Sequence, residues 1–142
     1  MIKIIKRAEN GQIIELKFLR NAILPNGEID IALEDFNLPY FYSKTPYQTI
    51  VAKIENSDDI IKLMHVVYVL TRMNDVPIRL FLLEIPYIDR EFPQDGEAFG
   101  LGIFINIINL LNFQRVSVIN PNSMVKALLH RLKIEENEPD YK

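Results

Sequence analysis

Ile78-Arg79-Leu80-Phe81-Leu82-Leu83-Glu84-Ile85 is the stretch of this sequence that decides the fold. It is a nearly continuous apolar run with the length of a strand. Strands of this kind belong to a sheet whose two faces are both covered, because neither side of such a strand can face water. The run therefore predicts a central strand of an α/β domain.

A helix is predicted immediately before this strand. Asn56 or Ser57 can cap it, and Asp58 and Asp59 in its first turn place negative charge at the positive end of the helix dipole. Asn74-Asp75 ends the pattern before Pro77. One face of the helix is expected to be core, with apolar residues at helical spacing: Ile60, Leu63, Met64, Val67 and Leu70.

The chain alternates strands and helices on both sides of this helix. A buried strand is predicted at Gln48–Ile54, a helix at Ala98–Leu111, a strand at Val116–Ile119 and a last helix at Met124–Leu132. Such an alternation predicts parallel βαβ crossovers. We therefore expect an α/β three-layer sandwich with a mostly parallel sheet.

The N-terminal part is expected to be β structure. Met1–Ile5 and Gln12–Leu19 are strand-like runs joined by Glu9-Asn10-Gly11, and Asn-Gly is a strong hairpin signal. Pro25-Asn26-Gly27 predicts a second turn, followed by a half-buried strand at Glu28–Leu33.

Asp35–Pro46 is expected to be a loop around an aromatic cluster. Its residues Tyr40-Phe41-Tyr42, with Tyr47, either form an interface patch or fold back over the sheet edge. We predict one domain over residues 1–134 and a fraying polar tail over 135–142.

Composition limits the function classes. The chain has 142 residues, 49% of them hydrophobic and 25% charged, which suits one globular domain with a real core. Its net charge of −3, with Lys and Arg scattered along the sequence, argues against nucleic-acid binding. The absence of cysteine excludes disulfides and thiolate metal sites. No apolar run is long enough for a membrane span, and no secretory leader is visible, so we expect a soluble cytoplasmic protein.

The loops after Ile85 and Ile119 are the places where an α/β sheet binds its ligand, beyond the carboxyl ends of the strands. They contain Pro86-Tyr87-Ile88-Asp89-Arg90 and Asn120-Pro121-Asn122-Ser123, and Gly96-Glu97-Ala98-Phe99 lies between them. Together with Leu24-Pro25-Asn26-Gly27-Glu28, these motifs resemble, in order and spacing, the N-terminal half of the ribose-phosphate pyrophosphokinases (phosphoribosyl-pyrophosphate synthetases). The resemblance runs from about Leu19 to Leu129, and its type is that of phage or bacterial members.

The resemblance implies a phosphoribosyltransferase-like fold and a nucleotide site for ATP or ADP with Mg. Leu24, Asn26 and Glu28 would correspond to the family's adenine-contacting loop. Asp89 and Arg90 would correspond to phosphate contacts, and Asn122 to a position that helps to hold Mg-ATP. The family also associates through this half, and its adenine loop reaches a neighbouring subunit. The resemblance thus implies a homo-oligomer with Leu24–Glu28 near the contact.

The sequence also departs from the family pattern. The loop after Pro86-Tyr87 is about one residue short, the family's Ser-x-Lys position holds Gly100-Leu101-Gly102, and its Asp-x-His position holds Asn120-Pro121-Asn122. Asn is a poor replacement for imidazole at a metal. The chain ends where the second family domain would begin. Because pyrophosphoryl transfer depends on Mg and cationic groups, we expect no catalytic residues and no activity from this chain alone.

Each candidate also has a purely structural interpretation. Arg90, beside acidic neighbours, is typical of a surface ion pair. Asn-Gly turns such as the one at Asn26 form without ligands, and Asn122 or Ser123 can be the N-cap of the last helix. His65 and His130 lie in helical patterns without carboxylate partners, so we expect structural or solvated histidines and no metal site.

Three functions are consistent with these observations. We favour a stand-alone assembly or regulatory domain, a pseudoenzyme of nucleotide biosynthesis that retains weak nucleotide binding. The alternative is one half of a split ribose-phosphate pyrophosphokinase, completed by a separate C-terminal chain that brings the ribose 5-phosphate site. The third is a binding module that has kept only the fold.

Overall fold

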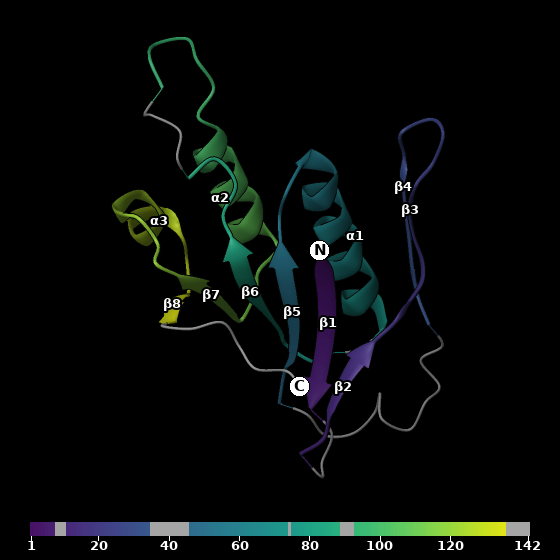
Figure 1. Cartoon of the computed structure of the whole chain (residues 1–142). Helices are drawn as coiled ribbons and strands as arrows, with labels where there is room; N and C mark the ends of the chain where they lie inside the picture. The colour runs from purple at the N-terminus through teal and green to yellow at the C-terminus, as the bar shows by residue number, and fades with distance from the viewer. Residues whose placement is uncertain (8–10, 35–45, 74, 89–92, 136–142) are drawn as a thin grey trace.

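The computed structural model describes residues 1–7, 11–34, 46–73, 75–88 and 93–135. Six strands form one mixed sheet in the order β2-β1-β5-β6-β7-β8 (Figure 1). Strand β1 is antiparallel to both of its neighbours, whereas β5 to β8 run parallel to one another. The strands are β1 (Ile2–Arg7), β2 (Ile13–Leu16), β5 (Gln48–Lys53), β6 (Ile78–Glu84), β7 (Arg115–Ile119) and β8 (Leu132–Glu135). The predicted α/β domain with a mostly parallel sheet is confirmed at this level.

The predicted N-terminal hairpin is confirmed by the antiparallel pairing of β1 with β2, in which Arg7 lies opposite Ile13. Its Glu9-Asn10 turn lies outside the described residues, but Gly11 follows with a φ of +83°. The expected strand Gln12–Leu19 is wrong in one respect, because the chain leaves the sheet at Lys17. Its carbonyl accepts the Glu34 N–H (2.9 Å), which closes the base of a second hairpin.

That second hairpin is a separate two-stranded ribbon, β3 (Phe18–Ile23) and β4 (Ile29–Leu33). Figure 1 shows it standing beyond α1 and away from the large sheet. The predicted turn is confirmed: Gly27 has a φ of +87°, and its N–H donates to the Leu24 carbonyl (2.8 Å). Glycine tolerates this left-handed conformation because it has no Cβ.

Three described helices, α1 (Ser57–Met73), α2 (Gly100–Leu110) and α3 (Ser123–Leu128), pack on one face of the sheet (Figure 1). Their buried residues share one core with alternate strand residues such as Ile50, Leu80 and Val118. Right-handed crossovers that always advance in the same direction, here from β5 to β8, place their helices on the same face. A second helical layer is not among the described residues.

The opposite face of the sheet nevertheless holds a smaller buried cluster of Ile5, Val51 and Phe81. Phe81 is only 7% exposed, although its neighbours Leu80 and Leu82 point into the helix-covered core. This burial on both faces explains why the sequence of β6 is a continuous apolar run rather than an alternating one.

The predicted cap and core face of α1 are confirmed with one exception. The Asn56 side chain accepts the Asp59 N–H (3.0 Å), and Ile60, Leu63, Val67 and Leu70 are buried. Met64 was expected in the core but is 38% exposed, and the fully buried Val66 takes part in the core instead. The apolar stripe is therefore rotated slightly around the helix from its predicted position.

The expected last helix, Met124–Leu132, is wrong in its second half. Helix α3 ends at Leu128, Leu129 is extended, and Leu132–Glu135 form β8 beside β7. His130 consequently lies in a turn and not in a helix. In residues 132–135, pairing with the edge of β7 outweighs the local preference for helix, so a strand forms. No helix within the described part of the chain is long and apolar enough to cross a membrane.

Candidate functional site

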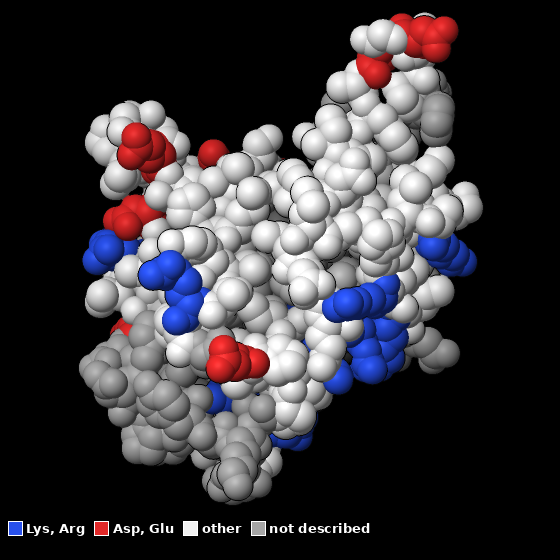
Figure 2. All heavy atoms as spheres, turned by 180° about the vertical axis from the view of Figure 1, so that it is seen from behind, with Lys and Arg blue, Asp and Glu red and all other residues white. Residues whose placement is uncertain are grey.

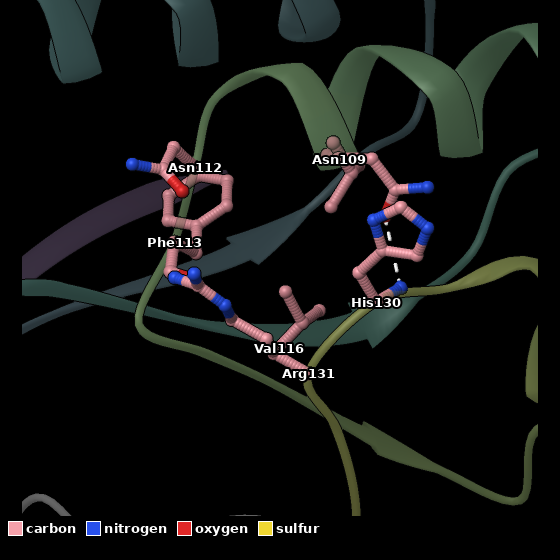
Figure 3. Close-up of a pocket in the computed structure, with 7 residues that line it drawn as sticks. Asn109, Asn112, Phe113, Val116, His130 and Arg131 are labelled. Atoms are coloured by element: carbon pink, nitrogen blue, oxygen red, sulfur yellow. Dashed lines mark hydrogen bonds between the residues drawn. The ribbon is translucent and has the colours of Figure 1, made fainter.

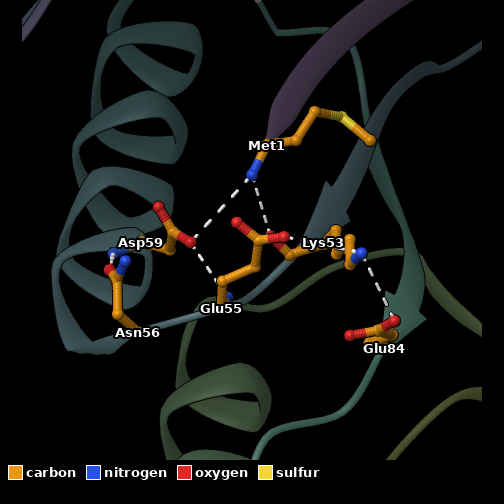
Figure 4. A network of polar contacts seen from close by, with 6 residues as sticks. All are labelled: Met1, Lys53, Glu55, Asn56, Asp59 and Glu84. Atoms are coloured by element: carbon orange, nitrogen blue, oxygen red, sulfur yellow. Dashed lines mark hydrogen bonds and ion pairs between the residues drawn. The ribbon is translucent and has the colours of Figure 1, made fainter.

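The carboxyl edge of the parallel strands carries a compact polar network (Figure 4). Lys53 ends β5 and pairs in register with Glu84 at the end of β6. The Lys53 ammonium lies 3.5 Å from the Glu84 carboxylate and 3.5 Å from that of Glu55. The nearby charge of Glu84, followed by the hydrogen bond with Glu55, raises the pKa of Lys53. This lysine is thus held in its charged form by two carboxylates.

The start of α1 completes the network from the other side. The Asp59 carboxylate accepts the Glu55 N–H (2.9 Å) and lies 4.0 Å from the Met1 ammonium group, which donates to the Lys53 carbonyl (2.9 Å). The Asn56 side chain caps the Asp59 N–H in the first turn of the helix. An external anion at that N–H would have to displace Asn56.

Charge at this edge does not suit a polyphosphate. The described residues of the network carry three negative charges, on Glu55, Asp59 and Glu84. They carry two positive charges, on Lys53 and the Met1 ammonium group. A transferring phosphoryl group needs surplus cations or a metal ion to spread its charge. The arrangement can join strands β5 and β6 to α1, but it supplies no free cation to a phosphate.

The start of α2 is covered by two aromatic rings. A Cβ on Gly100 would lie 2.7 Å from the Tyr87 ring, and a Cβ on Gly102 would lie 2.7 Å from the Phe99 ring. Tyr87 adopts a φ of +65° to place its ring there. Aromatic rings thus pack against both glycines, at the positions that the resemblance would align with the family's Ser and Lys.

Asn122 lies after β7, at the start of α3. Its side-chain oxygen accepts the Val125 N–H (2.9 Å), which makes it the helix N-cap. The capping interpretation of Asn122 is therefore confirmed, with Ser123 as the first residue of the helix. Whether Asn122 also touches a nucleotide stays a prediction.

Leu24, Asn26 and Glu28 meet at the tip of the β3–β4 hairpin. The Leu24 N–H donates to the Glu28 carbonyl (2.7 Å), and the Asn26 side chain accepts the Glu28 N–H (3.1 Å). An ion pair between Arg20 and Asp30 (2.9 Å) ties the two strands below the tip. All three tip residues are exposed, so a ligand or another chain can reach them.

The structure does not bring all predicted site residues together. Figure 1 places the hairpin tip and helix α3, with Asn122 at its start, on opposite sides of the domain. Asp89 and Arg90 lie outside the described residues. Within the described part, a cavity of about 60 Å³ lies between the hairpin base and α1, lined by Phe18, Ile31, Asp59 and Lys62 among others. It is far smaller than the several hundred Å³ of a typical ligand pocket.

The contact of His65 is local to its own helix. The His65 imidazole lies 2.8 Å from the Ile61 carbonyl, one turn earlier in α1. No group of three His, Cys, Asp or Glu side chains within the described ranges could hold a metal ion.

The Lys53 network was not predicted from the sequence. Its signal is a charged residue at the end of each of two adjacent parallel strands, Lys53 and Glu84, which the sheet register brings together. Comparison with known proteins adds no family assignment: no protein-family model and no curated protein matches this chain.

Proposed function

We propose that this chain is a stand-alone domain of the ribose-phosphate pyrophosphokinase type, catalytically inactive alone, that acts as an assembly or regulatory module and binds adenine nucleotide weakly. The proposal rests on the order of the resembling motifs along an α/β domain with a mostly parallel sheet. A phosphoribosyltransferase-like fold, ATP or ADP with Mg as ligand, and a homo-oligomeric state belong to the same proposal.

The β3–β4 hairpin is the observation that carries it. Leu19 is 63% exposed, Ile23 49% and Leu24 38%, on a ribbon that stands away from the large sheet (Figure 1). A two-stranded ribbon has little stability of its own, and exposed apolar side chains in a group are typical of an interaction surface. The resemblance places its adenine loop and its contact with a neighbouring subunit at this same hairpin.

The polar edge of the sheet supports the absence of independent catalysis. Lys53 is engaged by two glutamates, and the Asn56 side chain caps the Asp59 N–H in the first turn of α1. Glycine stands at both positions where the family's Ser-x-Lys would be, with aromatic rings packed over them. These contacts remove the groups that would neutralise a transferring pyrophosphate.

Sedimentation equilibrium tests the assembly role. We expect the wild-type chain to self-associate at micromolar concentration and Ile23→Glu to be monomeric, because a charge cannot be buried without a partner at the contact. Leu110→Glu is the matched control, since Leu110 is 83% exposed on α2, remote from the hairpin, and should leave association unchanged. A wild-type chain that stays monomeric would contradict the assembly role.

The split-enzyme alternative is favoured by the place of the polar network. Lys53, Glu55 and Glu84 lie beyond the carboxyl ends of parallel strands, where α/β sheets bind ligands. A second polypeptide that supplies the missing cations would complete a site there. Mixing the chain with an isolated C-terminal half of a ribose-phosphate pyrophosphokinase, and measuring AMP release from ATP and ribose 5-phosphate, distinguishes this alternative.

A further inference from the structure

A second polar site lies at the opposite end of the sheet, where α2 ends and β7 begins (Figure 3). It is a cavity of about 80 Å³ lined by Ile108, Asn109, Asn112, Phe113, Val116, His130 and Arg131. The lining contains one cation, one imidazole and two amides, but no carboxylate. A space of this size holds several waters or one group of a few heavy atoms, and it is too small for a nucleoside.

The surrounding sequence is positively charged. From Ala98 to Ile134 the chain contains no Asp or Glu, whereas it contains Arg115, Lys126, Arg131 and Lys133. Figure 2, which views the molecule from behind, shows a group of blue side chains at the lower right with no red among the described residues there. Lys133 is paired with Glu135 just beyond this segment (2.9 Å), whereas the residues that line the cavity beside Arg131 include no carboxylate. A cation without a neighbouring carboxylate raises the local concentration of anions.

Arg131 is held across this cavity in an unusual backbone conformation. Its φ is +57°, a region that a long side chain occupies only at a cost of roughly 1 to 2 kcal/mol. Its carbonyl accepts the Val116 N–H (3.0 Å), and its guanidinium donates one N–H to the Phe113 carbonyl (3.1 Å). A guanidinium carries five N–H donors, and the bond to Phe113 uses one of them. Glycine would adopt this backbone conformation without strain. The strain is therefore consistent with a role for the arginine side chain itself.

Asn109 positions the rest of the site. Its side chain donates to the Leu128 carbonyl (3.0 Å) and accepts the His130 N–H (2.9 Å), which joins the end of α2 to the turn before β8. Figure 3 shows the His130 ring beside Asn109, with Arg131 reaching toward Phe113 and Asn112. Asn112, with a φ of +57°, follows the helix end in the left-handed conformation that asparagine tolerates.

We infer that this cavity is a binding site for a small oxyanion of the phosphate class, held chiefly by the Arg131 guanidinium, with the His130 and Asn112 side chains among the lining of the cavity. Charge-assisted hydrogen bonds from a fixed arginine are the strongest polar contacts available to such an anion. The site lies at the amino end of β7, so it is separate from the carboxyl edge and from the hairpin tip. It does not depend on the proposed function.

The test is a titration of the whole chain with inorganic phosphate at constant ionic strength set by chloride, followed by NMR signals of the His130 ring and the Asn112 side-chain amide. We expect saturable shifts at millimolar phosphate. Arg131→Gly removes the guanidinium and also relieves the strain of the positive φ. This variant should therefore fold at least as well as the wild-type chain. Phosphate affinity should fall at least about tenfold in this variant.

Lys126→Gln is the matched control, because it removes one positive charge from the same acid-free segment without lining the cavity. Its phosphate affinity should stay within about twofold of the wild-type value, because the lost charge attracts phosphate only from a distance and the salt screens that attraction. A parallel titration with a phosphate monoester shows whether free phosphate or the phosphate of a larger molecule is preferred. Equal shifts in wild type and Arg131→Gly, or none in the wild type, would overturn the inference.

Discussion

Replacing Gly100 by alanine should destabilise this protein, although alanine is the better helix former. The added Cβ would lie 2.7 Å from one atom of the Tyr87 ring and 2.9 Å from two others, closer than van der Waals contact permits. Overpacking of this kind costs about 1 to 3 kcal/mol. The gain in helix propensity at this first helical residue is at most about 1 kcal/mol. We therefore expect a net loss of about 1 to 2 kcal/mol in the free energy of unfolding.

A double-mutant cycle in urea separates these two effects. In a Tyr87→Ala background the ring is absent, so Gly100→Ala should be neutral or stabilising by up to about 1 kcal/mol. The coupling energy between the two substitutions should thus be about 1 to 3 kcal/mol. If Gly100→Ala stabilises the wild-type chain as much as it stabilises Tyr87→Ala, the ring does not cover the start of α2 and the reasoning is refuted.

Three other substitutions test particular contacts. Asn56→Ala should lower the free energy of unfolding by about 1 kcal/mol in urea melts, because the Asp59 N–H loses its cap, whereas a change below a few tenths would contradict that role. Phe81→Ala should cost about 3 to 5 kcal/mol by the same measurement if the second face of the sheet is closed, and a cost near zero would mean that it is open. Lys53→Met should be less stable than wild type at neutral pH. Glu84 raises the folded-state pKa of Lys53, so the lysine's contribution is complete below its unfolded pKa and is lost as pH rises through the folded value. Thermal melts of both proteins should converge as the pH rises past the raised folded-state pKa, above the ordinary lysine value of about 10.4. A difference that persists at still higher pH would point to packing instead.

The alternation of helices with the parallel strands β5, β6 and β7 could be predicted from sequence because each signal was local. The apolar run of β6, the capped helix α1 and the Asn-Gly turn at the hairpin tip all follow from residues adjacent in the chain. The pattern predicted βαβ crossovers, and sequence-adjacent strands then lie side by side in the sheet.

What could not be predicted depends on pairing between distant residues. Strand β8 was expected to be helix, since Met124–Leu132 has a plausible helical pattern and only the free edge of β7 decides otherwise. The exposure of Met64 and the burial of Val66 depend on how α1 is rotated against the sheet and the hairpin. Such tertiary choices override local propensity.

In the candidate site, too, some features follow from local sequence and others depend on contacts between distant residues. The turn at Leu24–Glu28 and the cap at Asn122 follow from local sequence, and both are present. The Lys53 contact with Glu84 needs the register of two parallel strands, and the cavity at Arg131 needs the end of α2 beside β8. No motif of adjacent residues signals either arrangement.

A calorimetric titration with ADP and with Mg-ATP, on wild type and on Ile23→Glu, tests the central proposal most directly. The resemblance implies that the hairpin tip joins a neighbouring subunit's nucleotide site, so association and nucleotide binding should fail together. We predict saturable heat with the wild-type chain, none with Ile23→Glu, and a weaker response with Glu28→Ala. Equal heats in wild type and Ile23→Glu would contradict a nucleotide site built by the hairpin, and no heat from either would leave no nucleotide site at all.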